Sequence, residues 1–525
     1  PAEDPAVLRS WLQHELTAHA GVLRDAASLE QAAKVVADTL VAPLPDTIAG
    51  AEVANLATVA RALTRANRTP ASRVAWVATI MLLPIVGVLA YLLLGETSIG
   101  RGRFERLRRA SSALRLPPQA PVLAPDRDAP LMDLARSING FGAVGGNRIT
   151  LLGDADAPAD EPMRNPKAAI NVLIADIEQA RQHVHIAFYI WLDDDTGTRV
   201  AQAVAAAARR GVQCRVMIDA LGSRAFHGGP LWRLMEAAGV RLLATLDDVN
   251  RIWHLPLSRV DLRDHRKLAV IDNRIGYCGS QNCADPEFRV KARFAPWVDV
   301  LLRCQGPVVR QMQCLFLSGW IPEKGEDELA TLPAQEPVEQ FADGAVAQVF
   351  ETGPVTRHNA MSDMFVACMY AARQELIITT PYFVPDEAML RALCAAPRRG
   401  VKTTIIFPTR NDSRLVANAS RSCYADLLAC GVAVHTYPLG LLHAKTLTFD
   451  GEVALVGSAN MDRRSLELNF ENNLLVTDRA VAASVRARQL GYLSVSQQLT
   501  AEEVARWTPL QRLVQNAVGM MAPVL

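Results

Sequence analysis

The chain has 525 residues, which exceeds what a single hydrophobic core usually organises, so two or three domains are expected. Half of the residues are hydrophobic, which indicates one apolar segment in addition to globular domains. The formal net charge of +1 gives no global positive field, and this argues against nucleic acid as a partner. The nine cysteines are dispersed without CxxC pairs, which argues against a disulfide framework or a zinc site.

The N-terminal part is predicted to contain a helical region at residues 1–73 and a membrane segment at residues 74–94. Apolar residues recur at spacings of three and four in the first region, which is typical of amphipathic helices. Residues 74–94 carry no charge and, at about 1.5 Å per residue, are long enough to cross roughly 30 Å of hydrocarbon. Pro84 and Gly87 predict a kink, and both flanks are basic. The orientation therefore stays open, and a re-entrant hairpin is the alternative.

Two similar copies make up most of the remaining sequence, at residues 161–325 and 340–500, with an offset of about 180–190 residues. In each copy, apolar strand-like runs alternate with helical segments, which predicts an α/β fold with helices on both faces of a buried sheet. An acidic, proline-bearing stretch separates the copies and is predicted to be a linker.

Two further segments flank these copies. Residues 95–160 begin with a basic stretch and become rich in Pro, Ala and Asp, which predicts a basic juxtamembrane linker. Residues 501–525 carry apolar side chains at helical spacing from Leu510 onward and predict an amphipathic C-terminal helix. Packing on the core and lying on a membrane are equally compatible with this pattern.

Each copy carries the same motif: H-x-K, an Asp five residues after the Lys, and then G-S-x-N. The motif residues are His265, Lys267, Asp272, Ser280 and Asn282 in the first copy and His443, Lys445, Asp450, Ser458 and Asn460 in the second. A single H-x-K carries little weight, but two copies with identical spacing indicate a duplicated site. Because side chains alternate along a strand, the His and the Lys of each motif are expected on one face.

This set of residues suits phosphodiester chemistry. A neutral imidazole is a nucleophile and a proton carrier near pH 7, while Lys and Asn donate hydrogen bonds to phosphoryl oxygens. Two histidines on opposite sides of one phosphorus allow one to attack in line and the other to protonate the leaving oxygen. The lysines supply positive charge and no metal-binding motif is recognisable, so neither a metal nor a cofactor is expected.

Supporting roles are expected for the remaining motif residues. The serines and asparagines are candidates for binding or supporting the phosphate, while Asp272 and Asp450 suit an Asx turn or a local salt bridge. Asp299 and Glu471 follow the motifs and are predicted to orient the histidine of their own copy. Tyr189 and Tyr382 occupy equivalent strand ends, where lining the site and packing in the core are equal alternatives.

The duplicated motif resembles that of the phospholipase D superfamily, and phrases such as LRDHRKLAVID and GSANMDRRSLELNFENNLLV are similar to bacterial cardiolipin synthases. The resemblance covers roughly residues 74–525. It implies two similar α-β-α sandwich domains in a pseudo-two-fold pair, with the site at their interface. It also implies a phosphatidyl-histidine intermediate formed from phosphatidylglycerol, with glycerol leaving and a second phosphatidylglycerol attacking to give cardiolipin. His265 would be the nucleophile and His443 the acid and base.

The resemblance further implies phospholipid substrates and a bacterial inner membrane location with the active site facing the cytoplasm, and it leaves homo-oligomer formation open. Three alternatives remain. A phospholipase D hydrolase uses the same residues, with water completing the reaction. A nuclease of the same superfamily is expected to carry a basic groove and to need no membrane segment, so charge and residues 74–94 argue against it. A catalytically dead membrane scaffold is disfavoured by the intact His and Lys in both copies.

Overall fold

The computed structural model describes residues 49–65, 70–95, 99–114, 116, 127–153, 167–247, 262–334 and 338–520. The chain forms two compact units, one ending at residue 96 and the other beginning at residue 97. Of the helical region predicted at 1–73, the part before residue 49 lies outside the described residues.

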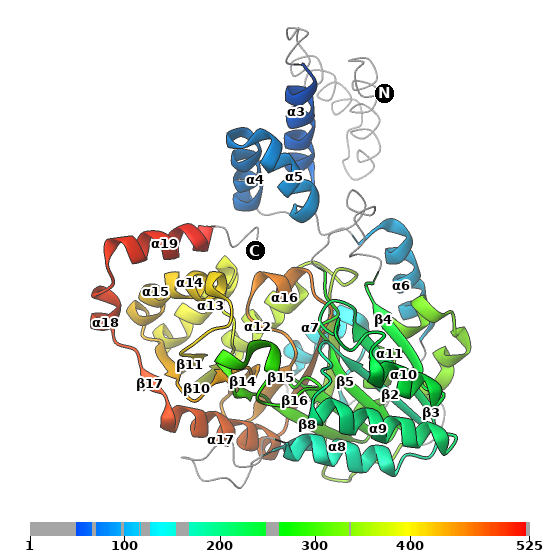
Figure 1. Ribbon diagram of the computed structural model, residues 1–525. Helices are drawn as coiled ribbons and strands as arrows, with labels where there is room; N and C mark the ends of the chain where they lie inside the picture. The colour runs from blue at the N-terminus through cyan, green and yellow to red at the C-terminus, as the bar shows by residue number, and fades with distance from the viewer. Residues whose placement is uncertain are drawn as a thin grey trace. The chain divides into compact units, whose positions relative to one another are not determined.

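The described residues of the first unit form three helices, α3 (Ala49–Thr64), α4 (Pro70–Leu82) and α5 (Pro84–Leu94), and the last two divide the predicted membrane segment (Figure 1). Pro84 has no N–H to continue α4, and Leu83 leaves the helical conformation with φ −132° and ψ 71°. The helices fold back on one another, with the ring centroids of Trp76 and Tyr91 5.3 Å apart. A single continuous helix over 74–94 is therefore not formed.

Close approach of the two helices depends on Gly87. A Cβ at this position would lie 2.5 Å from the carbonyl oxygen of Thr79, so any larger side chain would push the helices apart. At about 1.5 Å per residue, neither α4 nor α5 reaches roughly 30 Å. Within the described ranges, no helix combines the length and the apolar character that a membrane crossing requires.

One mixed sheet runs through the second unit, with fifteen strands among the described residues (Figure 1). The strands of the first half are β1 (Val144–Leu152), β2 (His183–Phe188), β3 (Gln213–Asp219), β4 (Arg241–Thr245), β5 (Lys267–Ile271), β6 (Ile275–Gly279) and β8 (Leu301–Gln305). Those of the second half are β9 (Ala345–Thr352), β10 (Glu375–Thr379), β11 (Lys402–Pro408), β12 (Ala433–Tyr437), β14 (Thr446–Phe449), β15 (Val453–Gly457), β16 (Glu471–Thr477) and β17 (Gln497–Gln498).

The two halves repeat the same strand order outward from the centre of this sheet. The order is β1-β8-β6-β5-β2-β3-β4 in one half and β9-β16-β15-β14-β10-β11-β12 in the other, with β17 added at the far edge. β1 and β9 pair antiparallel at the centre, with Val144 opposite Ala347. The predicted pseudo-two-fold pair of α/β halves is thus present, but the halves share one sheet instead of forming two separate ones.

Helices cover both faces of the sheet and complete the three-layered sandwich. One face is covered at the centre by α11 (Val308–Lys324) and α17 (Arg479–Val495), which share a core with strands of both halves. The other face is covered by α8 (Ala168–Glu178), α9 (Asp195–Arg209) and α10 (Pro230–Ala237) in the first half. In the second half it is covered by α12 (Ala360–Ala371), α13 (Glu387–Arg398) and α15 (Tyr424–Ala429).

The segment predicted as a linker at 95–160 is largely structured, which corrects that prediction. It contains α6 (Arg101–Ala113), α7 (Ala129–Asn139) and the central strand β1. The apolar side of α7 packs on β9 and α12 of the second half through Leu131, Met132 and Ala135. Buried apolar residues every three to four positions were the available signal, and the surrounding Pro, Ala and Asp obscured it.

The halves are also joined by a buried ion network around Arg266, the middle residue of the first H-x-K. Its guanidinium binds both carboxylate oxygens of Asp264 at 2.7 and 2.8 Å and reaches Glu351 of β9 at 3.2 Å. Gly319 of α11 makes room for it, since a Cβ there would lie 2.4 Å from a guanidinium nitrogen. In the second copy the equivalent residue is Ala444, so the network exists in one half alone.

Replacing Arg266 with Met is expected to lower the free energy of unfolding by about 3–5 kcal/mol, because two buried carboxylates lose their cation. Thermal unfolding of the purified chain measures this. Arg274→Met, at an exposed position in the turn after β5, is the matched control. Equal unfolding midpoints for the two variants would show that the network does not stabilise the junction.

Candidate active site

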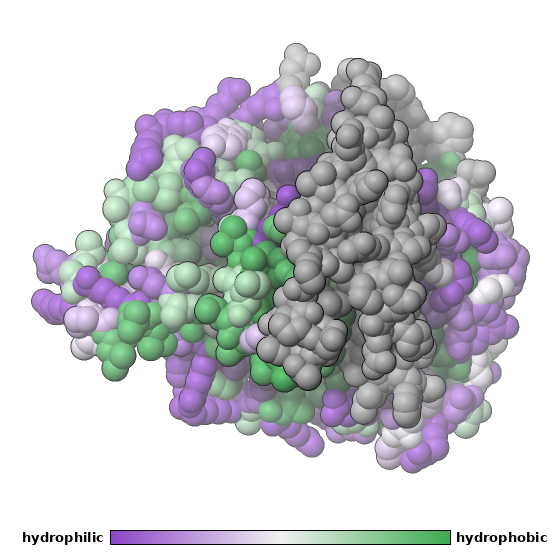
Figure 2. Space-filling model, turned by 90° about the horizontal axis from the view of Figure 1, so that it is seen from above, coloured by the Kyte–Doolittle hydropathy of each residue, from purple (hydrophilic) through white to green (hydrophobic). Residues whose placement is uncertain are grey.

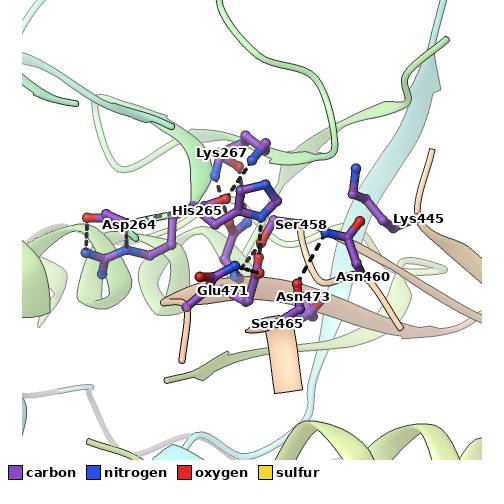
Figure 3. A network of polar contacts seen from close by, with 12 residues as sticks. Asp264, His265, Lys267, Lys445, Ser458, Asn460, Ser465, Glu471 and Asn473 are labelled. Carbon is purple, nitrogen blue, oxygen red and sulfur yellow. Dashed lines mark hydrogen bonds and ion pairs between the residues drawn. The ribbon is translucent and has the colours of Figure 1, made fainter. Parts of the chain in front are cut away.

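Each motif histidine contacts the acid of the other half, not the acid of its own. The Nδ1 atom of His265 lies 2.8 Å from a carboxylate oxygen of Glu471 (Figure 3). The Nδ1 atom of His443 lies 2.7 Å from a carboxylate oxygen of Asp299. Asp299 and Glu471 therefore do reach the histidines, but the pairing expected within each copy is wrong.

Backbone pairing between the halves explains this exchange. β7 (Trp297–Val298) runs parallel to β13 (Leu441–Leu442), which places Asp299 beside His443. An equivalent parallel bridge joins Asp264 to Phe470 and places Glu471 beside His265. The N–H groups of the two histidines donate to Phe470 and Val298 at 2.9 and 2.8 Å, so the pseudo-symmetry extends to the backbone.

The motif serines hold the two acids. The Ser280 hydroxyl donates to Asp299 at 2.6 Å and accepts from the N–H of Val300 at 3.0 Å. The Ser458 hydroxyl likewise donates to Glu471 and accepts from the N–H of Asn472 at 2.9 Å. Both serines are fully buried, so their geometry supports the acids rather than a phosphate.

The two motif lysines are buried next to the histidines. The Nζ atom of Lys267 donates to the carbonyl oxygen of His265 at 2.7 Å, and Lys445 does the same to His443 at 2.6 Å. Burial lowers the pKa of Lys267 to about 8, although Glu471 and Asp299 act in the opposite direction. Burial also lowers the pKa of Lys445 well below its usual value. An anionic ligand would favour the charged form of both lysines.

The histidines are neutral near pH 7. Burial and the neighbouring lysines lower the pKa of His443 to about 4 and that of His265 well below its usual value. The acids differ from one another. Burial raises the pKa of Glu471 to about 7. Burial also acts to raise the pKa of Asp299, but His443 and Lys445 outweigh it and the pKa is lowered.

The motif aspartates lie away from the histidines, as their predicted structural role requires. Asp272 accepts hydrogen bonds from the N–H groups of Arg181, Gln182 and His183, each at 2.8 Å. Asp450 binds the equivalent N–H groups at 373–375 in the second half and also pairs with Arg127. Each aspartate thus fixes the start of a neighbouring strand, and of the two expected alternatives, an Asx turn and a salt bridge, Asp450 forms the second with Arg127.

A cavity of about 920 Å³ opens onto both histidines. Asn282 and Asn460 line it, and Asn282 is oriented by the N–H of Ile190 at 3.3 Å. Tyr189 and Tyr382 also line it, with the ring of Tyr189 4.8 Å from that of His265. Of the two alternatives for these tyrosines, lining the site is therefore the one that the structure supports.

Relatives of known name match most of this chain. The family model of the cardiolipin synthase, phospholipase D-like domain matches residues 173–313 and 365–489. Cardiolipin synthase A of Shigella boydii serotype 4 (strain Sb227) is 37% identical over 470 residues, which cover 87% of this chain and 94% of that protein. The chain belongs to the cardiolipin synthase family.

Three further matches agree with this assignment. Cardiolipin synthase A of Escherichia coli O157:H7 has the same identity and coverage, and a phospholipase D-nuclease N-terminal model matches residues 53–96. Among solved structures, a phosphatidylserine synthase from Haemophilus influenzae Rd KW20 superposes with a TM-score of 0.53 at 13% identity. That match covers 76% of this chain and all of the other, and it supports the fold of a cardiolipin synthase family member.

Six charged residues that line the cavity were not predicted from the sequence. They are Arg224, Arg263, Lys291, Asp412, Asp462 and Arg464. None belongs to the repeated motif, and the signal was a departure from the repeat: Arg263 stands where the second copy has Leu441, two residues before the histidine. In a cardiolipin synthase fold, such asymmetric positions are where the two halves of the site can differ in what they bind.

The buried Lys267 predicts a basic limit to activity. Because its pKa is about 8, its positive charge is present below that pH and is lost as the pH rises through it. We expect kcat/KM to fall above pH 8, since this ratio reports the ionisation of the free enzyme. A profile between pH 6 and 10 measures this, and a flat profile to pH 10 would contradict it.

Proposed function

We propose that this chain transfers a phosphatidyl group from one phosphatidylglycerol to another, giving cardiolipin and glycerol. The observation that carries the proposal is the pair of neutral histidines, each held by a buried acid of the other half, at a single cavity. Both imidazoles line this cavity, where one phosphodiester would lie between them, and two buried lysines follow the histidines in the motifs and would balance its charge.

In the first half-reaction, Nε2 of His265 attacks phosphorus and the bond from phosphorus to the glycerol oxygen breaks. His443 gives its proton to that oxygen, and glycerol leaves. The bound phosphodiester anion favours the protonated form of His443 before this step, because it offsets the neighbouring lysines. The phosphatidyl group then remains on His265 as a phosphoramidate.

In the second half-reaction, a hydroxyl of another phosphatidylglycerol approaches from the side of His443. His443 takes the proton of this hydroxyl while its oxygen bonds to phosphorus and the bond to His265 breaks. Cardiolipin is released and the starting protonation state returns. In both steps, Lys267, Lys445, Asn282 and Asn460 stabilise the phosphoryl oxygens, while Asp299 and Glu471 fix the tautomer of the histidines.

Incubation of the purified protein with phosphatidylglycerol alone tests this proposal. Cardiolipin and glycerol in equal amounts are expected. Phosphatidic acid as the main product would instead identify a hydrolase, the second candidate, in which water takes the place of the acceptor lipid. Family membership favours transfer, because cardiolipin synthase A is the name of the relatives that match across most of the chain.

Membrane association is part of the proposal, and the C-terminal helices support it. α18 (Ala501–Ala505) leads into α19 (Pro509–Met520), which lies on α14 (Arg414–Ser422). α19 turns Gln515 inward, while Leu510 and Leu513 are 69% and 66% exposed. Core packing, one of the two alternatives for this helix, does not explain such exposure, whereas a lipid surface would cover it. Figure 2 shows hydrophobic side chains gathered at the surface among hydrophilic ones.

Replacing Leu510 and Leu513 together with Gln is expected to reduce turnover of phosphatidylglycerol in vesicles by about 30-fold. Partial burial of each Leu in lipid contributes roughly 1 kcal/mol. Turnover of a short-chain phosphatidylglycerol dissolved below its aggregation concentration is expected to stay unchanged. Leu490→Gln, on α17, is the matched control. Equal losses with both forms of substrate would contradict a role at the lipid surface.

A further inference from the structure

The two ends of the active-site cavity are chemically different despite the pseudo-symmetry of the fold. In the first half, the loop after β3 places Gly222 against the ring of Tyr189. In the second half, the loop after β11 places Asp412 at the hydroxyl of Tyr382, which donates to it at 2.6 Å. Among the residues that line this cavity, Tyr382, next to His443, thus has a carboxylate partner, whereas the glycine that packs on Tyr189 offers none.

Asp412 is held by groups from both halves. Its second oxygen forms an ion pair with Lys291 of η4 (Arg289–Phe294), which belongs to the first half. The carboxylate is only 2% exposed, whereas Lys291 is 46% exposed. A carboxylate has about four acceptor positions, so two donors leave capacity for a ligand in the cavity. The exposed ammonium can bind an anion without leaving its buried partner.

The ion pair of Asp412 and Lys291 lies on the side of the cavity where the alcohols of the proposed reaction would leave and enter. The rings of Tyr382 and His443 are 6.5 Å apart, and Lys291, Asp412 and both rings line the same cavity. If His443 serves as acid and base, the leaving alcohol and the incoming alcohol both lie on its side of the phosphorus. In the proposed reaction each of these alcohols is a glycerol group, and the incoming one carries a phosphodiester of its own.

We infer that Asp412 and Lys291 form the acceptor headgroup subsite: Asp412 accepts hydrogen bonds from the glycerol hydroxyls, and Lys291 binds the phosphodiester of the acceptor lipid. This inference rests on the proposed function and deepens it. A buried carboxylate that needs hydroxyl donors favours a polyol over a simple alcohol, because the latter leaves acceptor positions unfilled. The same subsite favours transfer over hydrolysis by holding the glycerol hydroxyl in the place that water would take.

Two soluble acceptors distinguish the role of Asp412, which would bind hydroxyls, from that of Lys291, which would bind a phosphodiester. With cardiolipin as the donor, free glycerol offers the hydroxyls alone, while glycerophosphoglycerol offers the hydroxyls and a phosphodiester. Asp412→Asn keeps an acceptor for Tyr382 but loses the charge, and it is expected to raise the KM of both acceptors about 10- to 100-fold. It should also raise the share of phosphatidic acid among the products. Lys291→Gln is expected to raise the KM of glycerophosphoglycerol about tenfold and to leave that of glycerol within about twofold.

Asp363→Asn is the matched control, since this α12 carboxylate pairs with Arg357 away from the cavity. Unchanged KM values in Asp412→Asn, or a uniform loss of transfer and hydrolysis, would overturn the role of Asp412. A rise of both KM values in Lys291→Gln would overturn the role of Lys291, and this variant decides the matter if Asp412→Asn does not fold. A wild-type protein that gives only phosphatidic acid from phosphatidylglycerol would instead refute the proposed function.

Discussion

Replacing either His265 or His443 with Ala is expected to reduce phosphatidyl transfer by at least about 10⁴-fold, although the other motif remains intact. Each histidine has a role that the other does not cover, since one bonds to phosphorus and the other carries the proton. Each also depends on an acid of the other half, so neither half contains a complete site. Two independent sites would lose only half of the activity.

Phosphatidylglycerol turnover and thermal unfolding together measure this result. Both variants should still fold, because Asp299 and Glu471 keep the hydrogen bonds from Ser280 and Ser458 when the imidazole is removed. His358→Ala, at an exposed position before α12, is the control for loss of a histidine. Rapid quenching in denaturant at neutral pH during turnover should leave the phosphatidyl adduct on His265. An adduct on His443 would reverse the assignment of roles.

The repeated motif and the α/β halves were predictable because they depend on local sequence. H-x-K stands at the start of β5 and just before β14, and the apolar residues that follow form the strands themselves. The next strand in each half ends at the Gly of G-S-x-N, as expected from the equal distance between H-x-K and G-S-x-N in the two copies. Period-two alternation and buried apolar runs are properties of a few neighbouring residues, so a single sequence carries them.

The exchange of acids between the halves was not predictable in this way. His443 and Asp299 are 144 residues apart, and His265 and Glu471 are 206 apart, so their pairing follows from strands of different copies meeting. The same holds for the shared sheet, which requires β1 and β9 to pair edge to edge. The broken helix at 83–84 had a local signal in Pro84, but charge and length alone favoured a continuous span.

Asp299→Asn and Glu471→Gln are expected to impair transfer with different pH dependence. Asp299 is ionised throughout the neutral range because its pKa is lowered, so its amide variant should lose about 10²- to 10⁴-fold at every pH from 5.5 to 8. Glu471 has a pKa of about 7 and is largely protonated at pH 5.5. Gln resembles the protonated acid, so Glu471→Gln should cost little at pH 5.5 and progressively more as the pH rises through 7.

The two variants are expected to differ because the charge of each acid decides the tautomer of the histidine that it contacts. An ionised acid accepts the Nδ1 proton and leaves Nε2 of its histidine free to attack or to carry a proton, whereas a protonated acid can donate to Nδ1 and favour the opposite tautomer. Wild-type activity should therefore rise as Glu471 ionises, and the activity of Glu471→Gln should not. The ratio of wild-type to variant kcat/KM, measured at half-unit steps from pH 5.5 to 8, tests this. Ratios that stay parallel for the two variants would mean that both acids carry the same charge at pH 5.5, and the asymmetry between Asp299 and Glu471 would have no role in transfer.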